Sequence, residues 1–202
     1  MTRILLAVAA VIALSAFGLS SWILFERLTE EKTISGEGVI AVPANTGGPF
    51  ELVSNENKAI NQSAFKGKFA LVYFGYSFCP DVCPTGLQNV AAGIDKAGAK
   101  ADGVVPVFVT VDPERDTPDQ LKQYVDLFHP RMVGLTGSEA QIKDVAKKFR
   151  VYYALRKDLD KEDYPVDHSS FTYLMDPDWK LIAVFRHNAT PKNIADVLKQ
   201  IL

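Results

Sequence analysis

Two cysteines, Cys79 and Cys83, are the only thiols in this 202-residue chain, and both lie in the stretch "GYSFCPDVCPT". Each is followed directly by a proline. Such a pair supports three uses: a structural disulfide, reversible thiol–disulfide exchange, or the binding of a soft metal ion. A disulfide here would close so small a loop that it adds little to the stability of a folded core, which makes the structural use the least favoured. The other two uses stay open on the spacing alone.

Three histidines are candidates for a third metal ligand, because two thiolates leave most metal sites incomplete. His129, in "LFHP", lies at the predicted end of a helix, where a cation near the C-terminal dipole is a sufficient explanation. His187 follows a predicted strand and is expected at the surface. His168, in "VDHSSFTYLMDP", directly precedes another predicted strand. On composition alone, His168 is either a metal ligand or a packed, hydrogen-bonded loop histidine.

A Cys–Cys–His set suits copper, because soft thiolates hold Cu(I) and an imidazole helps to retain Cu(II). Structural zinc usually takes a fourth protein ligand. Asp81 and Asp167 are the carboxylates nearest to these residues in sequence, and we expect them to be solvated or to support the ligands from behind. Copper is therefore the predicted metal if His168 reaches the thiols.

The elements around the cysteines determine how reactive the thiols are. Lys68–Tyr76 is a continuous apolar run, which is typical of a strand buried on both faces. Apolar residues at helical spacing predict a helix over Thr85–Ala99. Pro80 fits the first turn of a helix that begins at the cysteines. The thiols then lie where a strand leads into a helix, and the free amides of a helix N-terminus favour the thiolate.

The remaining pattern alternates strands with helices before it closes with a hairpin. Predicted strands are Val104–Val111, Met132–Gly137, Phe171–Met175 and Leu181–Arg186; predicted helices are Pro118–Phe128, a segment from the cap Ser138 to Arg150, and a last one after Thr190-Pro191. Alternation implies parallel strands with right-handed crossovers. We therefore predict an α/β, thioredoxin-like fold with a central mixed sheet flanked by helices. In such a fold the loop that carries His168 packs beside the cysteine motif.

The N-terminal segment has a different character. Ile4–Phe25 contains no charged residue and, as a helix, would be about 33 Å long, enough to cross the ~30 Å core of a bilayer. Arg3 precedes this run, so the positive-inside tendency places the N-terminus in the cytoplasm. A signal peptide cleaved after Ser15 is the alternative, but the apolar run continues well beyond that point and favours an uncleaved single transmembrane helix.

The sequence thus predicts an anchor over residues 1–25, a Gly/Pro-rich tether over 26–49 and a folded domain over 50–202. This organisation predicts a protein of the bacterial inner membrane with its C-terminal domain in the periplasm. In that oxidising space two cysteines pair unless they are kept reduced or metal-bound. The net charge of −2 gives no electrostatic footprint for nucleic acid, so that class of partner is excluded.

Three motifs in order, "FGYSFCPDVCPT", "VDPERDTP" and "VDHSSFTYLMDP", resemble the Sco/SenC family of membrane-anchored copper chaperones over about residues 48–202. The resemblance implies that Cys79, Cys83 and His168 bind one copper ion, Cu(I) or Cu(II). It also implies delivery of that ion to the binuclear copper centre of cytochrome c oxidase. The expected partner is the copper-binding subunit of the oxidase, together with a periplasmic copper donor or thiol reductant.

The motif "DPERDTP" supports two interpretations. Asp112 follows a buried strand and so lies at the edge of the sheet that also carries the cysteines, where it is expected to support the copper loop or to contact the partner. The simpler interpretation is turn chemistry, with Thr117 as a helix cap and Arg115 paired locally.

Other functions use the same thiols. A thiol–disulfide oxidoreductase that reduces the cysteines of the oxidase copper subunit, or senses redox state, is the main alternative, and Cys79 and Cys83 would then be its redox-active pair. A thiol peroxidase is less favoured, because Tyr76 occupies the place of the threonine expected before a peroxidatic cysteine. His168 separates the first two functions, since thiol–disulfide exchange does not require it.

Overall fold

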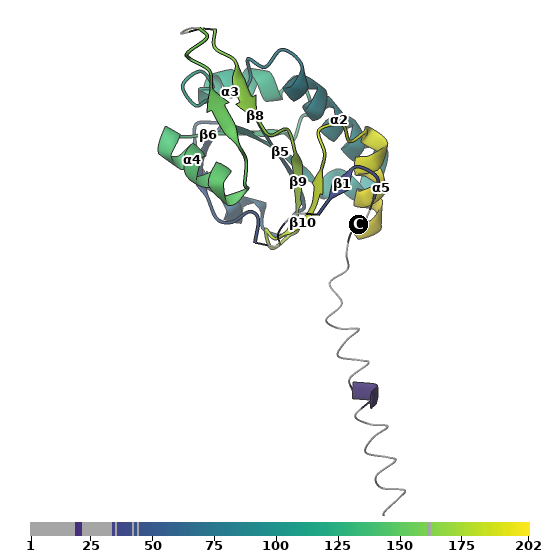
Figure 1. Ribbon diagram of the computed structural model, residues 1–202. Helices are drawn as coiled ribbons and strands as arrows, with labels where there is room; N and C mark the ends of the chain where they lie inside the picture. Colours follow the sequence, from purple (N-terminus) through teal and green to yellow (C-terminus); the bar gives the residue numbers. More distant parts are fainter. Residues whose placement is uncertain (1–18, 22–33, 35, 42, 44, 161–162) are drawn as a thin grey trace, which may run out of the picture. The chain divides into compact units, whose positions relative to one another are not determined.

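The computed structural model describes residues 19–21, 34, 36–41, 43, 45–160 and 163–202 (Figure 1). The chain divides into two units, residues 1–33 and residues 34–202. Within the first unit, residues 19–21 are described, and they are helical. Among the described residues there is no helix of the length and apolar character needed to cross a membrane. The predicted transmembrane helix, Ile4–Phe25, lies outside the described residues except for that one turn.

The second unit is built on a mixed sheet, as the sequence predicts. Its strand order is β1 (Val39–Ile40), β10 (Leu181–Phe185), β9 (Thr172–Met175), β4 (Ala70–Gly75), β5 (Val105–Thr110), β6 (Val133–Thr136), β2 (Glu51–Ser54) and β3 (Ala59–Asn61). The central strands β4, β5 and β6 are parallel, and the strands on either side pair antiparallel.

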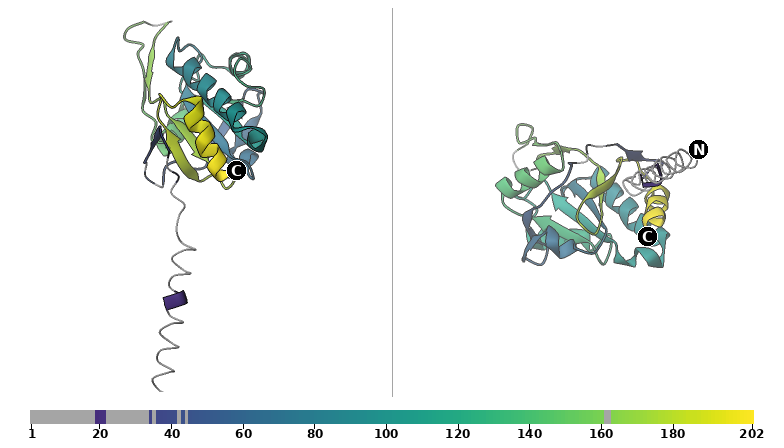
Figure 2. Two further views of the ribbon diagram at one scale, coloured as in Figure 1. Left: turned by 90° about the vertical axis from the view of Figure 1, so that its right-hand side faces the viewer. Right: turned by 90° about the horizontal axis from the view of Figure 1, so that it is seen from below.

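Helices cover both faces of this sheet. Helices α2 (Val82–Ala97) and α5 (Pro191–Ile201) pack side by side (Figure 2). Val90 and Ile94 of α2 form one cluster with buried side chains of α5 and with Leu71 of β4. Helices α3 (Pro118–Val125) and α4 (Glu139–Lys148) contribute to the other cluster, in which Phe74 of β4 meets Phe149. Every residue of β4 is buried, so the strand that leads into the cysteine motif has its position fixed from both sides.

Helix starts follow their predicted caps. The side chains of Thr117, Ser138 and Thr190 each accept a hydrogen bond from the backbone amide three residues on. Helix α2 differs from its prediction, because it begins at Val82 rather than Thr85. Pro80 therefore precedes the helix, and Pro84 occupies the first turn, where a missing N–H costs no intrahelical hydrogen bond.

Pro106, which is unusual inside a strand, lies in the interior of β5. The backbone amides of Val105 and Val111 donate toward the β4 side. Alternation then directs the nitrogen of Pro106 toward the β6 side. Pairing with β6 begins at Val107, one residue later, so the proline interrupts no hydrogen bond of that ladder.

Several short strands have no clear signal in the sequence. Strand β1 lies within the predicted tether, residues 26–49, and pairs with β10, while β2 and β3 form a hairpin at the far edge. A separate two-stranded ribbon consists of β7 (Tyr153–Leu155) and β8 (Val166–His168). These strands have two to four residues each, too few to establish an alternating pattern. The β7–β8 ribbon matters most, because His168 is its last residue.

Candidate metal centre

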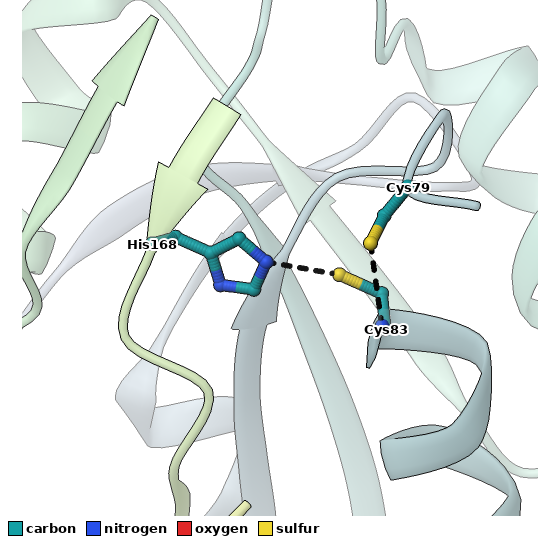
Figure 3. Close-up of side chains that lie close together, drawn as sticks. All are labelled: Cys79, Cys83 and His168. Atoms are coloured by element: carbon teal, nitrogen blue, oxygen red, sulfur yellow. Dashed lines mark hydrogen bonds between the residues drawn. The ribbon is translucent and has the colours of Figure 1, made fainter. Parts of the chain in front are cut away.

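Three segments that are distant in sequence bring Cys79, Cys83 and His168 together (Figure 3). Cys79 lies in the loop after β4, Cys83 in the first turn of α2 and His168 at the end of β8. The Sγ atom of Cys83 is 3.2 Å from Nε2 of His168, and Sγ of Cys79 is 3.4 Å from the backbone nitrogen of Cys83. The three ligand atoms all lie within 4.8 Å of one another. One metal ion of ordinary ligand distances fits among them.

Two glycines allow the N-terminus of α2 to approach β4 closely enough to bury Cys83. A Cβ atom at Gly75, the last residue of β4, would lie 2.6 Å from Sγ of Cys83. A Cβ atom at Gly86, one turn further along α2, would lie 2.7 Å from the ring of Tyr73. The hydroxyl of Tyr73 in turn donates to the carbonyl oxygen of Val82. Close packing of strand and helix therefore fixes the Cys83 sulfur, which is fully buried.

The pKa values of the two thiols are shifted in opposite directions. The pKa of Cys79 is lowered, first because the Cys83 thiol donates a hydrogen bond to its sulfur, and further by backbone amides at the start of α2. The pKa of Cys83 is raised by the same pairing and by burial. In the metal-free protein Cys79 thus holds the negative charge and Cys83 holds the proton. Cys79 is also the more accessible of the two.

This asymmetry predicts selective alkylation of the reduced, metal-free protein. With limiting iodoacetamide, Cys79 should be modified and Cys83 spared, because the thiolate is the nucleophile. The rate should stay nearly constant from about pH 8 down to about pH 6, since the lowered pKa of Cys79 keeps it ionised across that range. Peptide mapping by mass spectrometry locates the label, and Cys79→Ser serves as the control that should react slowly. A rate falling about tenfold for each pH unit, as for an ordinary thiol, would contradict the assignment.

His168 is oriented by its neighbours. Its Nδ1 lies 3.2 Å from the carbonyl oxygen of Ser169, which can only accept, so Nδ1 carries the proton and the lone pair of Nε2 faces the sulfurs. The ring of Tyr76 meets the imidazole edge-on at 5.8 Å between centroids. His168 is therefore both a packed, hydrogen-bonded histidine and one that presents an unprotonated nitrogen to the thiols. A second hydrogen-bonding partner of this kind is typical of metal-binding histidines.

The two carboxylates predicted to support the metal ligands, Asp112 and Asp167, have different environments. Asp112 is fully buried, and its oxygens accept hydrogen bonds from the Tyr164 hydroxyl, at 2.8 Å, and from Nε of Arg115. Asp167 is an exposed residue paired with Arg156 at 3.3 Å, and strand alternation directs it away from the face that carries the His168 side chain. Asp112 is thus buried and bonded to Tyr164 and Arg115, whereas Asp167 faces solvent.

The other two histidines have different environments from each other. His187 is exposed, as predicted. The prediction of a cation at His129 is wrong: the residue is buried, burial lowers its pKa, and its Nδ1 accepts a hydrogen bond from the backbone amide of Arg131. Burial favours the neutral ring because charging it would remove solvation that the protein does not replace.

Asp116 supports the cysteine loop and was missed by the sequence interpretation, which centred on Asp112. Its carboxylate is fully buried and accepts hydrogen bonds from the amide and hydroxyl of Ser77 and from the hydroxyl of Thr110. Burial raises the pKa of Asp116, although these hydrogen bonds oppose the rise. The available signal was a second aspartate a few residues after a buried strand. Asp116 ties the loop that begins at Ser77 to the end of β5.

The fold and the site together define a class: a thioredoxin-like protein whose dithiol, at the end of a central strand, is joined by a histidine from an added ribbon. The SCO1/SenC family model matches residues 40–202, and the chain belongs to this family.

Among its relatives, the protein SenC of Rhodobacter capsulatus is 39% identical over 196 residues, which cover 96% of this chain and 87% of SenC. The crystal structure of Arabidopsis thaliana ScoI with copper bound is 44% identical, covers 77% of this chain and 97% of that one, and has a TM-score of 0.72. The structure of BsSco, described as showing a disulfide switch in a member of the Sco family of cytochrome c oxidase assembly proteins, is 27% identical. It covers 81% of this chain and 99% of its own, with a TM-score of 0.62.

Proposed function

We propose that the protein carries copper: Cys79, Cys83 and His168 bind one copper ion and deliver it to the binuclear copper centre of cytochrome c oxidase during assembly. The observation that carries this proposal is the convergence of two sulfurs and one imidazole nitrogen within 4.8 Å of one another. Membership of the SCO1/SenC family supports it, as do the copper-bound Arabidopsis relative and the association of BsSco with oxidase assembly.

The donor set fits copper in both oxidation states. Two sulfurs satisfy the preference of Cu(I) for soft ligands, and the imidazole adds a donor that suits Cu(II). Binding requires Cys83 to lose its proton, so uptake of the ion releases protons and strengthens with rising pH. Phe78 and Val82, which directly precede Cys79 and Cys83, expose 48% and 44% of their surface. They give the receiving protein an apolar surface to contact beside the ion.

The proposal includes a location. Residues 1–25 anchor the protein in the bacterial inner membrane with the N-terminus in the cytoplasm, and the copper-binding domain faces the periplasm. The uncharged run Ile4–Phe25 and the preceding Arg3 support this orientation. Because β1 pairs with β10, the tether after the anchor would end before Val39.

Deletion of the gene tests this function in the cell. Oxidase activity should fall in copper-poor medium and recover when copper is added, because excess copper bypasses a carrier. A plasmid encoding the intact chain should restore activity, whereas His168→Ala should not. His187→Ala is the matched control, since His187 is exposed outside the site, and it should restore activity fully. Normal oxidase activity in the deletion strain at low copper, or full restoration by His168→Ala, would contradict the proposal.

Thiol–disulfide exchange is the second candidate, and the opposite pKa shifts of the two cysteines favour it. The Cys79 thiolate would attack a disulfide of the target and release one target thiolate. Cys83 would then lose its proton and attack the Cys79 sulfur, releasing the second thiolate and leaving a Cys79–Cys83 disulfide. Two electrons pass to the target. For this function His168→Ala would retain activity, and an added thiol reductant rather than copper would rescue the deletion strain.

A further inference from the structure

Arg115 contacts both of the segments that meet at the site. Its guanidinium carbon lies 3.7 Å from the ring centroid of Tyr164, 5.0 Å from that of Phe78 and 5.6 Å from that of Tyr76. Tyr76 and Phe78 belong to the cysteine loop, and Tyr164 belongs to the segment that enters β8. Arg115 therefore lies between the half of the site that carries the thiols and the half that carries the imidazole.

Hydrogen bonds give these contacts a defined geometry. Nη2 of Arg115 donates to the backbone carbonyl of Tyr164 at 2.9 Å, while Nε donates to the carboxylate of Asp112. The same carboxylate accepts the Tyr164 hydroxyl at 2.8 Å. Asp112 lies two residues after the end of β5, so Tyr164 is held to the edge of the main sheet through both its backbone and its side chain.

From Tyr164 the chain runs straight into the strand that ends at His168. Val166, two residues on, is the first residue of β8 and is buried in the main core cluster. On the other side of the site, Tyr76 packs edge-on against the His168 ring while Arg115 lies over Tyr76. A displacement of the Arg115 guanidinium would thus move His168, both through the backbone of β8 and through the Tyr76 ring.

We infer that Arg115 is a positioning residue that sets the place of the His168 imidazole relative to the two thiols. The inference rests on the proposed function, in which His168 is a copper ligand. It goes beyond a local pairing of Arg115 with Asp112, because the guanidinium also reaches Tyr164, 49 residues away in sequence. Arg115 should therefore govern the part of copper binding that depends on histidine, which is the retention of Cu(II), more than the part that depends on the dithiol.

Arg115→Lys is the informative substitution. Lysine keeps a positive charge beside the buried Asp112 carboxylate, so the fold is not left with an unpaired buried charge. A single ammonium group cannot reproduce a planar fork that binds Asp112 and the Tyr164 carbonyl while stacking on the Tyr164 ring. The variant thus removes positioning while it keeps the charge.

The test is made on the full-length protein with Cu(I) and Cu(II) ions as probes, each in competition with a chelator. Arg115→Lys should weaken Cu(II) binding about tenfold, the lower end of the cost of losing an outer-sphere partner of a metal-binding histidine. Its thiolate-to-Cu(II) absorption band and electron paramagnetic resonance spectrum should shift toward those of His168→Ala. Cu(I) affinity should change by less than about threefold, because both thiols remain.

Two further variants complete the design. Tyr164→Phe removes the hydroxyl bond to Asp112 but keeps the ring and the carbonyl, so it should shift the Cu(II) spectrum in the same direction by a smaller amount. Arg156→Lys is the matched control: Arg156 lies on the same ribbon segment but makes exposed ion pairs with Asp158 and Asp167, and it should leave both affinities unchanged.

The outcomes separate this inference from the proposed function. If His168→Ala changes Cu(II) affinity and spectrum while Arg115→Lys and Tyr164→Phe change neither, the positioning role is overturned and the ligand set stands. Equal losses of Cu(I) and Cu(II) binding in Arg115→Lys would also overturn it, since they would indicate damage to the dithiol half. If His168→Ala itself leaves Cu(II) binding unaltered, the proposed ligand set fails and the inference fails with it.

Discussion

Cys83→Ser is expected to eliminate tight binding of Cu(I) while the protein remains folded. The Cys83 sulfur is 3.2 Å from Nε2 of His168, and the three ligand atoms all lie within 4.8 Å of one another. A serine hydroxyl is a hard, protonated donor with little affinity for Cu(I). The loss should exceed about 100-fold, the upper end of what removal of a mere outer-sphere partner costs.

The measurement is an anaerobic competition with a Cu(I) chelator, supported by thermal unfolding of the metal-free proteins. Thr85→Ser, an exposed change in the same helical turn, is the control and should bind Cu(I) as the parent does. The melting temperatures of all three proteins should agree within a few degrees, because serine and cysteine have similar volumes. Undiminished Cu(I) affinity in Cys83→Ser would show that the buried sulfur is not a ligand.

Gly75→Ala is expected to lower both stability and copper affinity, although it adds a single methyl group. That group would lie 2.6 Å from the Cys83 sulfur and 3.2 Å from the rings of Phe108 and Tyr73, so the sulfur or the helix that carries it must move. Overpacking of this kind typically costs about 1–3 kcal/mol of the free energy of unfolding. The displaced sulfur should weaken Cu(I) binding as well, because a metal site depends on the exact arrangement of its ligands.

Gly103→Ala provides the matched control. A Cβ atom at Gly103, in the short helix Ala99–Gly103, would meet nothing within 4 Å, so stability and copper affinity should both be retained. Each kcal/mol lost in Gly75→Ala should lower the melting temperature by about 2–4 °C for a domain of this size. Equal melting temperatures and equal copper affinities for the two variants would refute the account of how Cys83 is held.

The core of the fold was predictable because its signals are local. Strands β4 and β5 lie inside continuous apolar runs, and the caps Thr117, Ser138 and Thr190 begin the helices that they were predicted to begin. The order of these elements was enough to place the cysteine motif where a central strand leads into a helix. It was also enough to predict a mixed, thioredoxin-like sheet.

What could not be predicted depends on contacts between distant residues. Strand β8, which carries His168, has only three residues, too few to show an alternating pattern in the sequence. Composition therefore left the role of that histidine open. Arg115 was expected to pair locally, and it does so with Asp112, but its guanidinium also donates to the backbone carbonyl of Tyr164. The burial that keeps His129 neutral depends on the packing of the folded protein. The sequence does not reveal that burial, so it predicted a cation.

A titration of the reduced protein, residues 27–202, with Cu(I) under anaerobic conditions tests the central claim most directly. With a competing chelator present, the account predicts that one equivalent of copper binds tightly and that Cys79→Ser loses it. Absence of tight Cu(I) binding, together with a measurable reduction potential for a Cys79–Cys83 disulfide, would contradict the copper site and identify the pair as a redox dithiol.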